Sequence, residues 1–416
     1  MIDINFIREN PEKVKAAVAA KQLDPKMIDE VLELDKGRRK LLQEAEALRA
    51  DKNKAAKEQD KKRGKEIKAK LQEIEPELKE VEGKYQKAIY QIPNLPAGDV
   101  KEGKDERENE VLRKEGNPPK FSATGGQGFR PKDHLELGEA LDIIDVKRGA
   151  KVSGARFGYL KGDGALLELA LVNFALEVLV KENFKPVIPP VLIKKESMAG
   201  MGYLEHGGEE DMFTLPKDDL ILVGTSEQAI GPMHKDEILK VQDLPLRYVG
   251  FSSCFRREAG SYGKDTKGIF RVHQFDKVEM FSYTTVEKSD EEHEYLLSLE
   301  EKLLQALELP YQVVKMCTGD LGAPAARKYD LEVWIPSQKK YRELTSTSTT
   351  TDFQSRRLAI KYQEGGETKY VHMLNGTAFA IGRTIVAILE NYQQKDGSVK
   401  IPKVLQKWMG KEKISL

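Results

Sequence analysis

The chain has few cysteines and no long apolar segment. Its 416 residues include only Cys254 and Cys317, too few for a disulfide framework or for a zinc site built from cysteines, and this favours a reducing compartment. No apolar run approaches the roughly 20 residues that span a bilayer. The N-terminus also lacks the basic and apolar blocks of a secretory signal. We therefore expect a cytoplasmic protein without a membrane partner.

The chain also lacks net charge. Lysine plus arginine and aspartate plus glutamate both number 68, which removes any bulk electrostatic argument for nucleic acid, and we expect no DNA partner. A basic surface must therefore be local. The hydrophobic content of 39% can fill the cores of two or three domains of roughly 150 residues each.

Apolar residues recur at alternating spacings of three and four in two stretches near the N-terminus, the pattern of a coiled-coil seam. The stretches cover residues 31–48 and 67–92, and the polar sequence EQDKKRGK separates them. Two long helices folded back as an antiparallel hairpin, over about residues 27–92, fit this pattern best. One short helix, capped at Asn10, is expected before the hairpin.

The turn of this hairpin is basic. Between Arg49 and Lys70 there are ten basic and four acidic residues, without an aromatic ring to stack on a base. One interpretation is a solvated coiled-coil surface, and the other is a grip on a phosphate backbone through counterion release. The charge alone does not decide between them. The candidate nucleic-acid-binding residues are Lys54, Lys57, Lys61, Lys62, Arg63 and Lys65.

Residues 92–110 have the proline, glycine and charge of a linker. We predict an N-terminal domain over residues 1–110, including the hairpin and this linker, and a second domain over residues 111–416. The expected strands of the second domain lie at 185–193, 220–224, 246–256 and 269–284, and its expected helices at 163–183, 288–307 and 377–394. Strands that follow one another through turns predict an α+β fold, with an antiparallel sheet flanked by helices.

The sequence FRREAGSYGKDTKGIFRVHQF, residues 255–275, places arginines, a glutamate and glycines between two strand-like segments. In the second strand Arg271, Phe275 and Glu279 share parity, so we expect their side chains on one face. An arginine suits a phosphate, a ring stacks on a base, and a carboxylate suits an amine. An amphipathic hairpin with surface ion pairs explains the pattern equally well, and this strand alone leaves both interpretations open.

Several motifs together point to one family. FRREAGSYGKDTKGIFRVHQFDKVEMF resembles the second signature motif of class II aminoacyl-tRNA synthetases, in the form found in bacterial-type seryl-tRNA synthetases. KPVIPPVLI resembles the first motif, a dimer-interface strand with its proline at Pro190, and LNGTAFAIGRTIVAILENYQ resembles the third, with its arginine at Arg383. VGTSEQ, TGDLG, YDLEVWIP, YREL and the basic hairpin follow the family's order. The resemblance covers essentially the whole chain and implies a homodimer in which a class II catalytic domain follows a tRNA-binding arm.

The resemblance also implies a role for each matching residue in the activation of L-serine by ATP. The expected catalytic residues are Arg256, Glu258 and Arg383. The residues expected to bind serine are Thr225, Ser226, Glu227, Arg256, Glu279, Asn375 and Thr377. Those expected to bind ATP are Arg256, Arg257, Glu258, Arg271, Val272, Phe275, Glu343, Leu344, Thr345, Ser346 and Arg383. Magnesium is expected at Glu343 and Ser346, and no zinc is expected.

In such an enzyme the seryl group passes from the adenylate to the 3′ end of serine tRNA, and selenocysteine tRNA is a further candidate acceptor. Three alternatives compete with this function. A paralogue that activates another small amino acid or loads a carrier protein tends to lack the arm. A class II synthetase for threonine or proline does not combine the arm with the TSE and NGT segments. A coiled-coil scaffold without activity needs no set of Arg256, Glu258 and Arg383.

Overall fold

The computed structural model describes residues 1–122, 125–126, 128–259, 265 and 267–416. Residues 260–264 and 266 of the glycine-rich loop singled out above therefore lie outside the described residues. The chain forms two compact units, Met1–Leu95 and Pro96–Leu416. Across the described ranges, no helix combines the length and the hydropathy that a membrane crossing requires.

The first unit begins with two short helices, α1 (Ile4–Glu9) and α2 (Pro11–Ala20), where one was expected. The α1 helix has six residues, too few to display a helical period, and its start is capped by Asp3, which accepts a hydrogen bond from the Asn5 amide. Asn10 separates the helices, but its side chain does not cap α2. Its Nδ2 instead donates to the Phe6 carbonyl at 3.2 Å.

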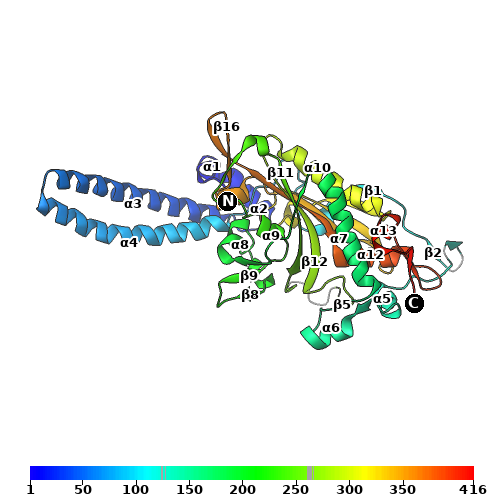
Figure 1. Cartoon of the computed structure of the whole chain (residues 1–416). Helices are drawn as coiled ribbons and strands as arrows, with labels where there is room; N and C mark the ends of the chain where they lie inside the picture. Colours follow the sequence, from blue (N-terminus) through cyan, green and yellow to red (C-terminus); the bar gives the residue numbers. More distant parts are fainter. Residues whose placement is uncertain (123–124, 127, 260–264, 266) are drawn as a thin grey trace. The chain divides into compact units, whose positions relative to one another are not determined.

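The predicted hairpin is confirmed. Helices α3 (Lys26–Lys57) and α4 (Lys61–Gln91) lie side by side and are joined by a short turn (Figure 1). Apolar residues of both helices are buried in the seam. The seam also contains Asp35, which no apolar pattern predicts and which forms ion pairs with Arg8 at 2.8 Å and Arg39 at 3.0 Å. These guanidinium groups compensate the burial of the carboxylate.

The second unit is built on an eight-stranded sheet in the order β1-β13-β14-β15-β18-β12-β11-β6. All neighbours are antiparallel except β11 and β6, so the predicted α+β fold with an antiparallel sheet is confirmed. In chain order, the strands are β1 (Glu110–Glu115), β6 (Lys185–Val187), β11 (Leu246–Phe255), β12 (Gln274–Thr284), β13 (Tyr311–Lys315), β14 (Arg327–Ile335), β15 (Lys340–Thr349) and β18 (His372–Ala380).

Smaller sheets and short helices surround this sheet. The remaining strands are β2 (Phe121–Ser122), β3 (Gly125–Gly126), β4 (Ile144–Asp145), β5 (Tyr159–Leu160), β7 (Leu192–Lys194), β8 (Thr214–Leu215), β9 (Leu220–Leu222), β10 (Ile238–Lys240), β16 (Lys361–Glu364), β17 (Glu367–Tyr370), β19 (Val399–Lys400) and β20 (Lys413–Ile414). The short α-helices are α5 (His134–Ala140), α6 (Val146–Ser153), α8 (Lys195–Met201), α9 (Glu227–Ile230), α11 (Phe353–Leu358) and α13 (Gln406–Met409).

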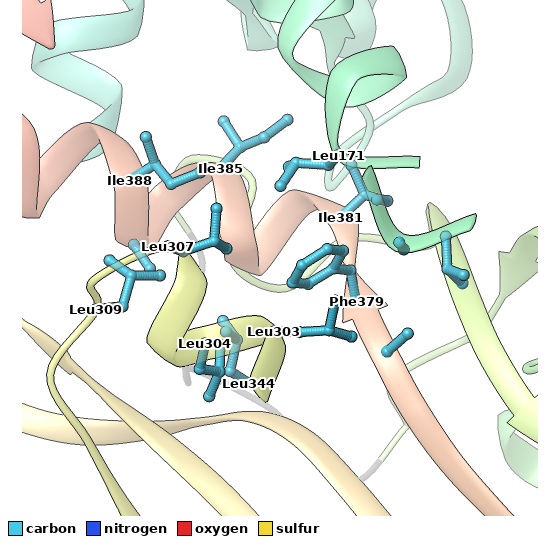
Figure 2. Close-up of a cluster of buried hydrophobic side chains, with 14 of the residues drawn as sticks. Leu171, Leu303, Leu304, Leu307, Leu309, Leu344, Phe379, Ile381, Ile385 and Ile388 are labelled. Atoms are coloured by element: carbon cyan, nitrogen blue, oxygen red, sulfur yellow. The ribbon is translucent and has the colours of Figure 1, made fainter. Parts of the chain in front are cut away.

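Three longer helices cover one face of the large sheet: α7 (Asp163–Lys181), α10 (Ser289–Ala306) and α12 (Ile381–Tyr392). Figure 2 shows the core between them, where Leu171 of α7, Leu303 of α10 and Ile385 of α12 meet around Phe379 of β18. The apolar faces of the helices pack against this side of the sheet. The opposite side carries a second apolar cluster, with Phe281 and Tyr283 of β12, and also polar groups.

Three expected boundaries were wrong. Residues 377–380, expected in a helix, end strand β18, and α12 begins at Ile381. The segment 185–193 is divided between β6 and β7, which lie in different sheets, because prolines cannot donate to a continuous ladder. Strand β12 begins at Gln274, so Arg271 precedes it, and the backbone amide of His273 donates to the Arg156 carbonyl at 3.0 Å instead.

Candidate active site

The sheet face away from the three helices holds a cavity of about 390 Å³. Alternation along β12 separates the two sides: Val278 and Met280 join the helix-covered core, whereas Lys277 and Glu279 line the cavity. Most of the predicted site residues come together here. The lining includes Thr225, Glu227, Arg256, Glu258, Arg271, Val272, Phe275, Glu279, Glu343, Leu344, Thr345, Ser346, Asn375, Thr377 and Arg383.

Two predicted residues are outside this lining. Ser226 is fully buried behind it, next to Gly250, where an added Cβ would come within 3.0 Å of the Ser226 Oγ. Arg257 is exposed; its Nε donates to the Met212 carbonyl at 2.9 Å, and its guanidinium lies 5.0 Å from the centre of the Phe213 ring. The Arg257 side chain therefore links two neighbouring segments, and Ser226 packs against Gly250 behind the lining.

One end of the cavity is acidic. Glu279 of β12 is 1% exposed, and its Oε2 accepts a hydrogen bond from the Thr377 hydroxyl at 3.0 Å. These two residues face each other across β12 and β18. The same oxygen lies 2.6 Å from the Lys277 Nζ. A carboxylate fixed in this way next to a hydroxyl suits a small ligand that carries an ammonium and a hydroxyl group.

A second carboxyl lies at this end. Glu227, at the start of α9, is buried and accepts a hydrogen bond from the Tyr203 hydroxyl. Burial and the charge of Glu279 raise the pKa of Glu227 to about 7, against the attraction of Lys277 and Arg256. Glu227 therefore changes its charge near neutral pH, and a cation that enters the cavity favours its ionised form.

Arg256 lies between the acidic end and the rest of the cavity. Its Nε donates to the Gly224 carbonyl at 3.1 Å, and its guanidinium lies 5.4 Å from the centre of the Phe275 ring. Its backbone amide donates to the His273 carbonyl at 2.9 Å. The side chain is thus anchored at one nitrogen, and its other N–H groups are available to a phosphate or carboxylate.

The other end of the cavity carries two arginine–glutamate pairs. Arg271 contacts Glu258 at 2.5 Å, and Glu258 has a left-handed backbone with φ of 56°, which is uncommon for this residue type. Arg383 donates to the Glu343 carbonyl at 3.0 Å and to its carboxylate at 3.2 Å. Burial alone would raise the pKa of Glu343, but Arg383 and Lys328 hold this pKa at about 2.

Aromatic rings support the arginines at this end. Phe270 lies under two guanidinium groups, that of Arg383 at 5.0 Å and that of Arg342 at 4.3 Å from the ring centre. Phe275 and Arg383 both line the cavity, as an adenine site between them would require. In strand β15, Leu344 packs into the core and the Thr345 hydroxyl donates to the buried Glu300 at 2.8 Å. The Thr345 hydroxyl is therefore already engaged by Glu300, although Thr345 and Ser346 both line the cavity.

Sequence reasoning missed several lining residues, among them Tyr203, Phe270, Lys277 and Lys328. Lys277 had a signal, because it lies between Phe275 and Glu279 with the same parity. Phe270 lies inside the quoted segment 255–275 but was given no role. Tyr203 and Lys328 had no signal, since their segments show no distinctive spacing of charged or aromatic residues. Lys328 lies 3.1 Å from Asp330, a buried carboxyl whose pKa is raised to about 7 by burial, against the attraction of this lysine.

The residues at the end with the two arginine–glutamate pairs fit a magnesium ion that is held mainly by phosphates. Within the described ranges, no cluster of three or more His, Cys, Asp or Glu side chains could hold a metal. Glu343 and Ser346 nevertheless line the same cavity, and the low pKa of Glu343 keeps its carboxylate ionised. Magnesium usually takes one or two carboxylates and completes its shell with water and substrate phosphates.

Two family models match the chain. The model described as tRNA synthetase class II core domain (G, H, P, S and T) matches residues 213–392, and that described as Seryl-tRNA synthetase N-terminal domain matches residues 1–96. Among curated relatives, the serine–tRNA ligase of Streptomyces coelicolor is 48% identical over 420 residues, and that of Dictyoglomus thermophilum is 46% identical over 423 residues. Each alignment covers 99% of this chain and 98% of the relative.

Solved structures agree with these matches. The crystal structure of seryl-tRNA synthetase from Pyrococcus horikoshii complexed with ATP is 43% identical, with a TM-score of 0.91 over 100% of this chain and 99% of that one. The cytoplasmic serine–tRNA ligase from Naegleria fowleri in complex with AMP is 36% identical, with a TM-score of 0.89 over the same shares of the two chains. The similarity therefore extends over both units.

Proposed function

The chain belongs to the seryl-tRNA synthetases, a class II family, and from this premise we propose how its cavity binds serine and ATP. The chain activates serine with ATP and charges serine tRNA. One observation carries the proposal: a single cavity gathers the acidic end at Glu279, the anchored Arg256 and the arginine–glutamate pairs at Arg271 and Arg383. An amino acid and a nucleotide thus meet at Arg256.

Serine occupies the acidic end. Glu279 takes the substrate ammonium, with Glu227 as the second carboxyl, and Thr377 contacts the substrate hydroxyl. Alanine is rejected because it leaves the polar groups around Thr377 without a partner, and threonine is rejected by its extra methyl group. The buried setting of Glu279 and Thr377 supports this assignment, since water competes poorly for groups that are 1% and 4% exposed.

ATP occupies the other end, with its adenine ring between Phe275 and Arg383. Glu258, oriented by Arg271, accepts from the adenine amino group, while Val272 and the backbone of β15 contact the nucleotide. The serine carboxylate attacks the α-phosphorus in line, a new C–O–P bond forms, and the bond to pyrophosphate breaks. Arg256 contacts the oxygens on which charge develops, so the step needs no protein base.

Glu343 and Ser346 would hold a magnesium ion, which when bound supplies positive charge to the phosphates of ATP. The ion pair between Glu343 and Arg383 fits this role, because it keeps the carboxylate ionised before the nucleotide arrives. Arg383 is then shared between this carboxylate and the adenine ring.

The hairpin contacts tRNA in the second step. Lys54, Lys57, Lys61, Lys62 and Lys65 are all exposed around the turn. Arg63 differs, because its guanidinium pairs with Asp51 and lies 3.2 Å from Glu58. We assign the phosphate contacts mainly to the lysines and assign Arg63 to the geometry of the turn.

A homodimer accounts for the apolar surface of the second unit. Along α7, Leu166, Leu169 and Val180 are 44%, 55% and 48% exposed, and their spacing places them on one helical face. Ile188, just beyond β6, is 88% exposed. Large aliphatic side chains that share a face in this way mark a protein interface, and two-fold dimers are the commonest closed assembly.

Replacement of Glu279 by glutamine tests the serine site. The change keeps the shape and removes the charge, so the KM for serine in ATP–pyrophosphate exchange should rise roughly 10- to 100-fold, the value of a hydrogen bond to a charged group. The KM for ATP should stay within about threefold, since ATP contacts other residues. An unchanged KM for serine in a folded Glu279→Gln protein would refute the assignment.

A further inference from the structure

We propose that Lys277 is a positioning residue for serine: its ammonium holds one oxygen of Glu279, so that the other oxygen is presented to the substrate ammonium. The inference rests on the proposed role of Glu279 and extends it to a residue that no motif singled out. Lys277 does not touch serine in this scheme; it acts through Glu279.

The geometry of Glu279 carries the proposal. Lys277 and Glu279 alternate on the cavity side of β12, and Lys277 is 6% exposed. Its Nζ lies 2.6 Å from the Glu279 Oε2, which also accepts the hydrogen bond of Thr377 at 3.0 Å. Both contacts thus fall on one oxygen. Two donors fix the plane of the carboxylate, and its Oε1 is left to a ligand.

The surroundings explain why a cation is needed there. Glu279 is buried, and a buried carboxylate without a compensating cation costs free energy. The acidic groups nearby increase this cost. The charged and titratable groups around Glu279 are Lys277 on β12, Glu227 at the start of α9, Glu300 on α10, Tyr203 after α8, and Cys254 and Arg256 at the end of β11.

The positive charge of Lys277 also lowers the pKa of the neighbouring acids Glu227 and Glu300. Burial raises the pKa of Glu300 well above its usual range and that of Glu227 to about 7, and Lys277 opposes both shifts. Without Lys277 the acidic end would hold protons on several carboxyls. A neutral Glu227 leaves less negative charge for the substrate ammonium, so serine binding would depend on pH.

A lysine–carboxylate pair of the same length elsewhere in the unit provides the matched control. Lys315 on β13 lies 2.6 Å from Asp99, and its side chain is 11% exposed, against 7% for Lys277. Lys315 does not line the cavity. Lys315→Met therefore removes a comparable lysine charge and should leave the KM for serine unchanged.

The experiment measures ATP–pyrophosphate exchange with the full chain at several pH values from 6 to 8.5. For Lys277→Met, the KM for serine should rise on the order of 30-fold at pH 7, as expected when one partner of a buried pair is lost, with the KM for ATP within about threefold. The ratio of the variant's serine KM to that of the unmodified chain should shrink as pH rises, because Glu227, whose pKa Lys277 lowers, then loses its proton.

Lys277→Arg keeps the charge and should recover most of the affinity for serine. Lys277→Gln, a donor without charge, gives the same expectation as methionine if the methionine variant does not fold. Equal rises in both KM values with a ratio independent of pH would show a general structural effect and overturn the proposal. An unchanged serine KM in Lys277→Met would overturn the proposal too. In that case Glu279→Gln shows whether the proposed function also fails. A raised serine KM in Glu279→Gln preserves the proposed function, and an unchanged serine KM refutes it.

Discussion

Removal of the Arg256 guanidinium should slow serine activation by two to three orders of magnitude. One of its nitrogens is committed to the Gly224 carbonyl at 3.1 Å, so the remaining N–H groups serve the substrates. A donor aimed at developing charge contributes about 2.7–4 kcal/mol to the transition state. Since about 1.36 kcal/mol corresponds to a factor of ten, Arg256→Ala should lower kcat/KM in exchange by about 10²- to 10³-fold.

The assay is serine-dependent ATP–pyrophosphate exchange, with folding checked by thermal unfolding. Arg256→Lys keeps the charge but cannot both hold Gly224 and reach the phosphate, so it should recover only part of the loss. Arg257→Ala is the comparison, since that side chain is exposed and contacts Met212 and Phe213 instead of the cavity. Its loss should stay below about tenfold. Near-normal exchange by a folded Arg256→Ala protein would remove Arg256 from the mechanism.

Three further outcomes are expected. Because the pKa of Glu227 is about 7 and the substrate is a cation, kcat/KM for serine should rise as pH increases through 7, and Glu227→Gln should flatten this profile; a profile shared by both proteins would refute the role of Glu227. Replacement of Lys61 and Lys62 by alanine removes about two phosphate contacts, so tRNA charging should weaken and should depend less steeply on salt, while ATP–pyrophosphate exchange stays normal. Equal losses in both assays would mean that these lysines stabilise the fold. Sedimentation should give about twice 46.9 kDa, and Leu169→Glu should shift the protein to a monomer; an unmodified chain that is active as a monomer would contradict the dimer.

Local periodicity predicted much of the fold. The spacing of apolar residues in 31–48 and 67–92 repeats along each helix, so the hairpin follows from neighbours in sequence. The strand 246–256 was placed within one residue of β11 for the same reason. The prediction of a helix over residues 377–380 was wrong because the secondary structure of this segment depends on distant residues. Thr377 extends β18 by pairing with Glu279 on β12. No periodicity within the segment reports that partner.

The residues of the site could be predicted only from the sequence motifs. Thr377 and Glu279 are 98 positions apart, and the hydrogen bond between them depends on the order of strands in the sheet. The resemblance to a family assigned both residues to one serine site without giving that order. Where no motif marked a residue, as for Tyr203 and Lys328, sequence reasoning had nothing to use. Arg63 was predicted to bind tRNA together with the neighbouring lysines, but its guanidinium is paired with Asp51. A count of charges in the sequence cannot distinguish a paired arginine from an exposed lysine.

The most direct test of the account is a pair of assays on one preparation of the full chain: ATP–pyrophosphate exchange with serine, threonine, alanine, glycine and proline in turn, and aminoacylation of serine tRNA. The account predicts exchange stimulated by serine far above the other amino acids, together with serine-dependent charging of the tRNA. Stronger stimulation by another amino acid, or exchange with serine that is never followed by charging, would contradict it.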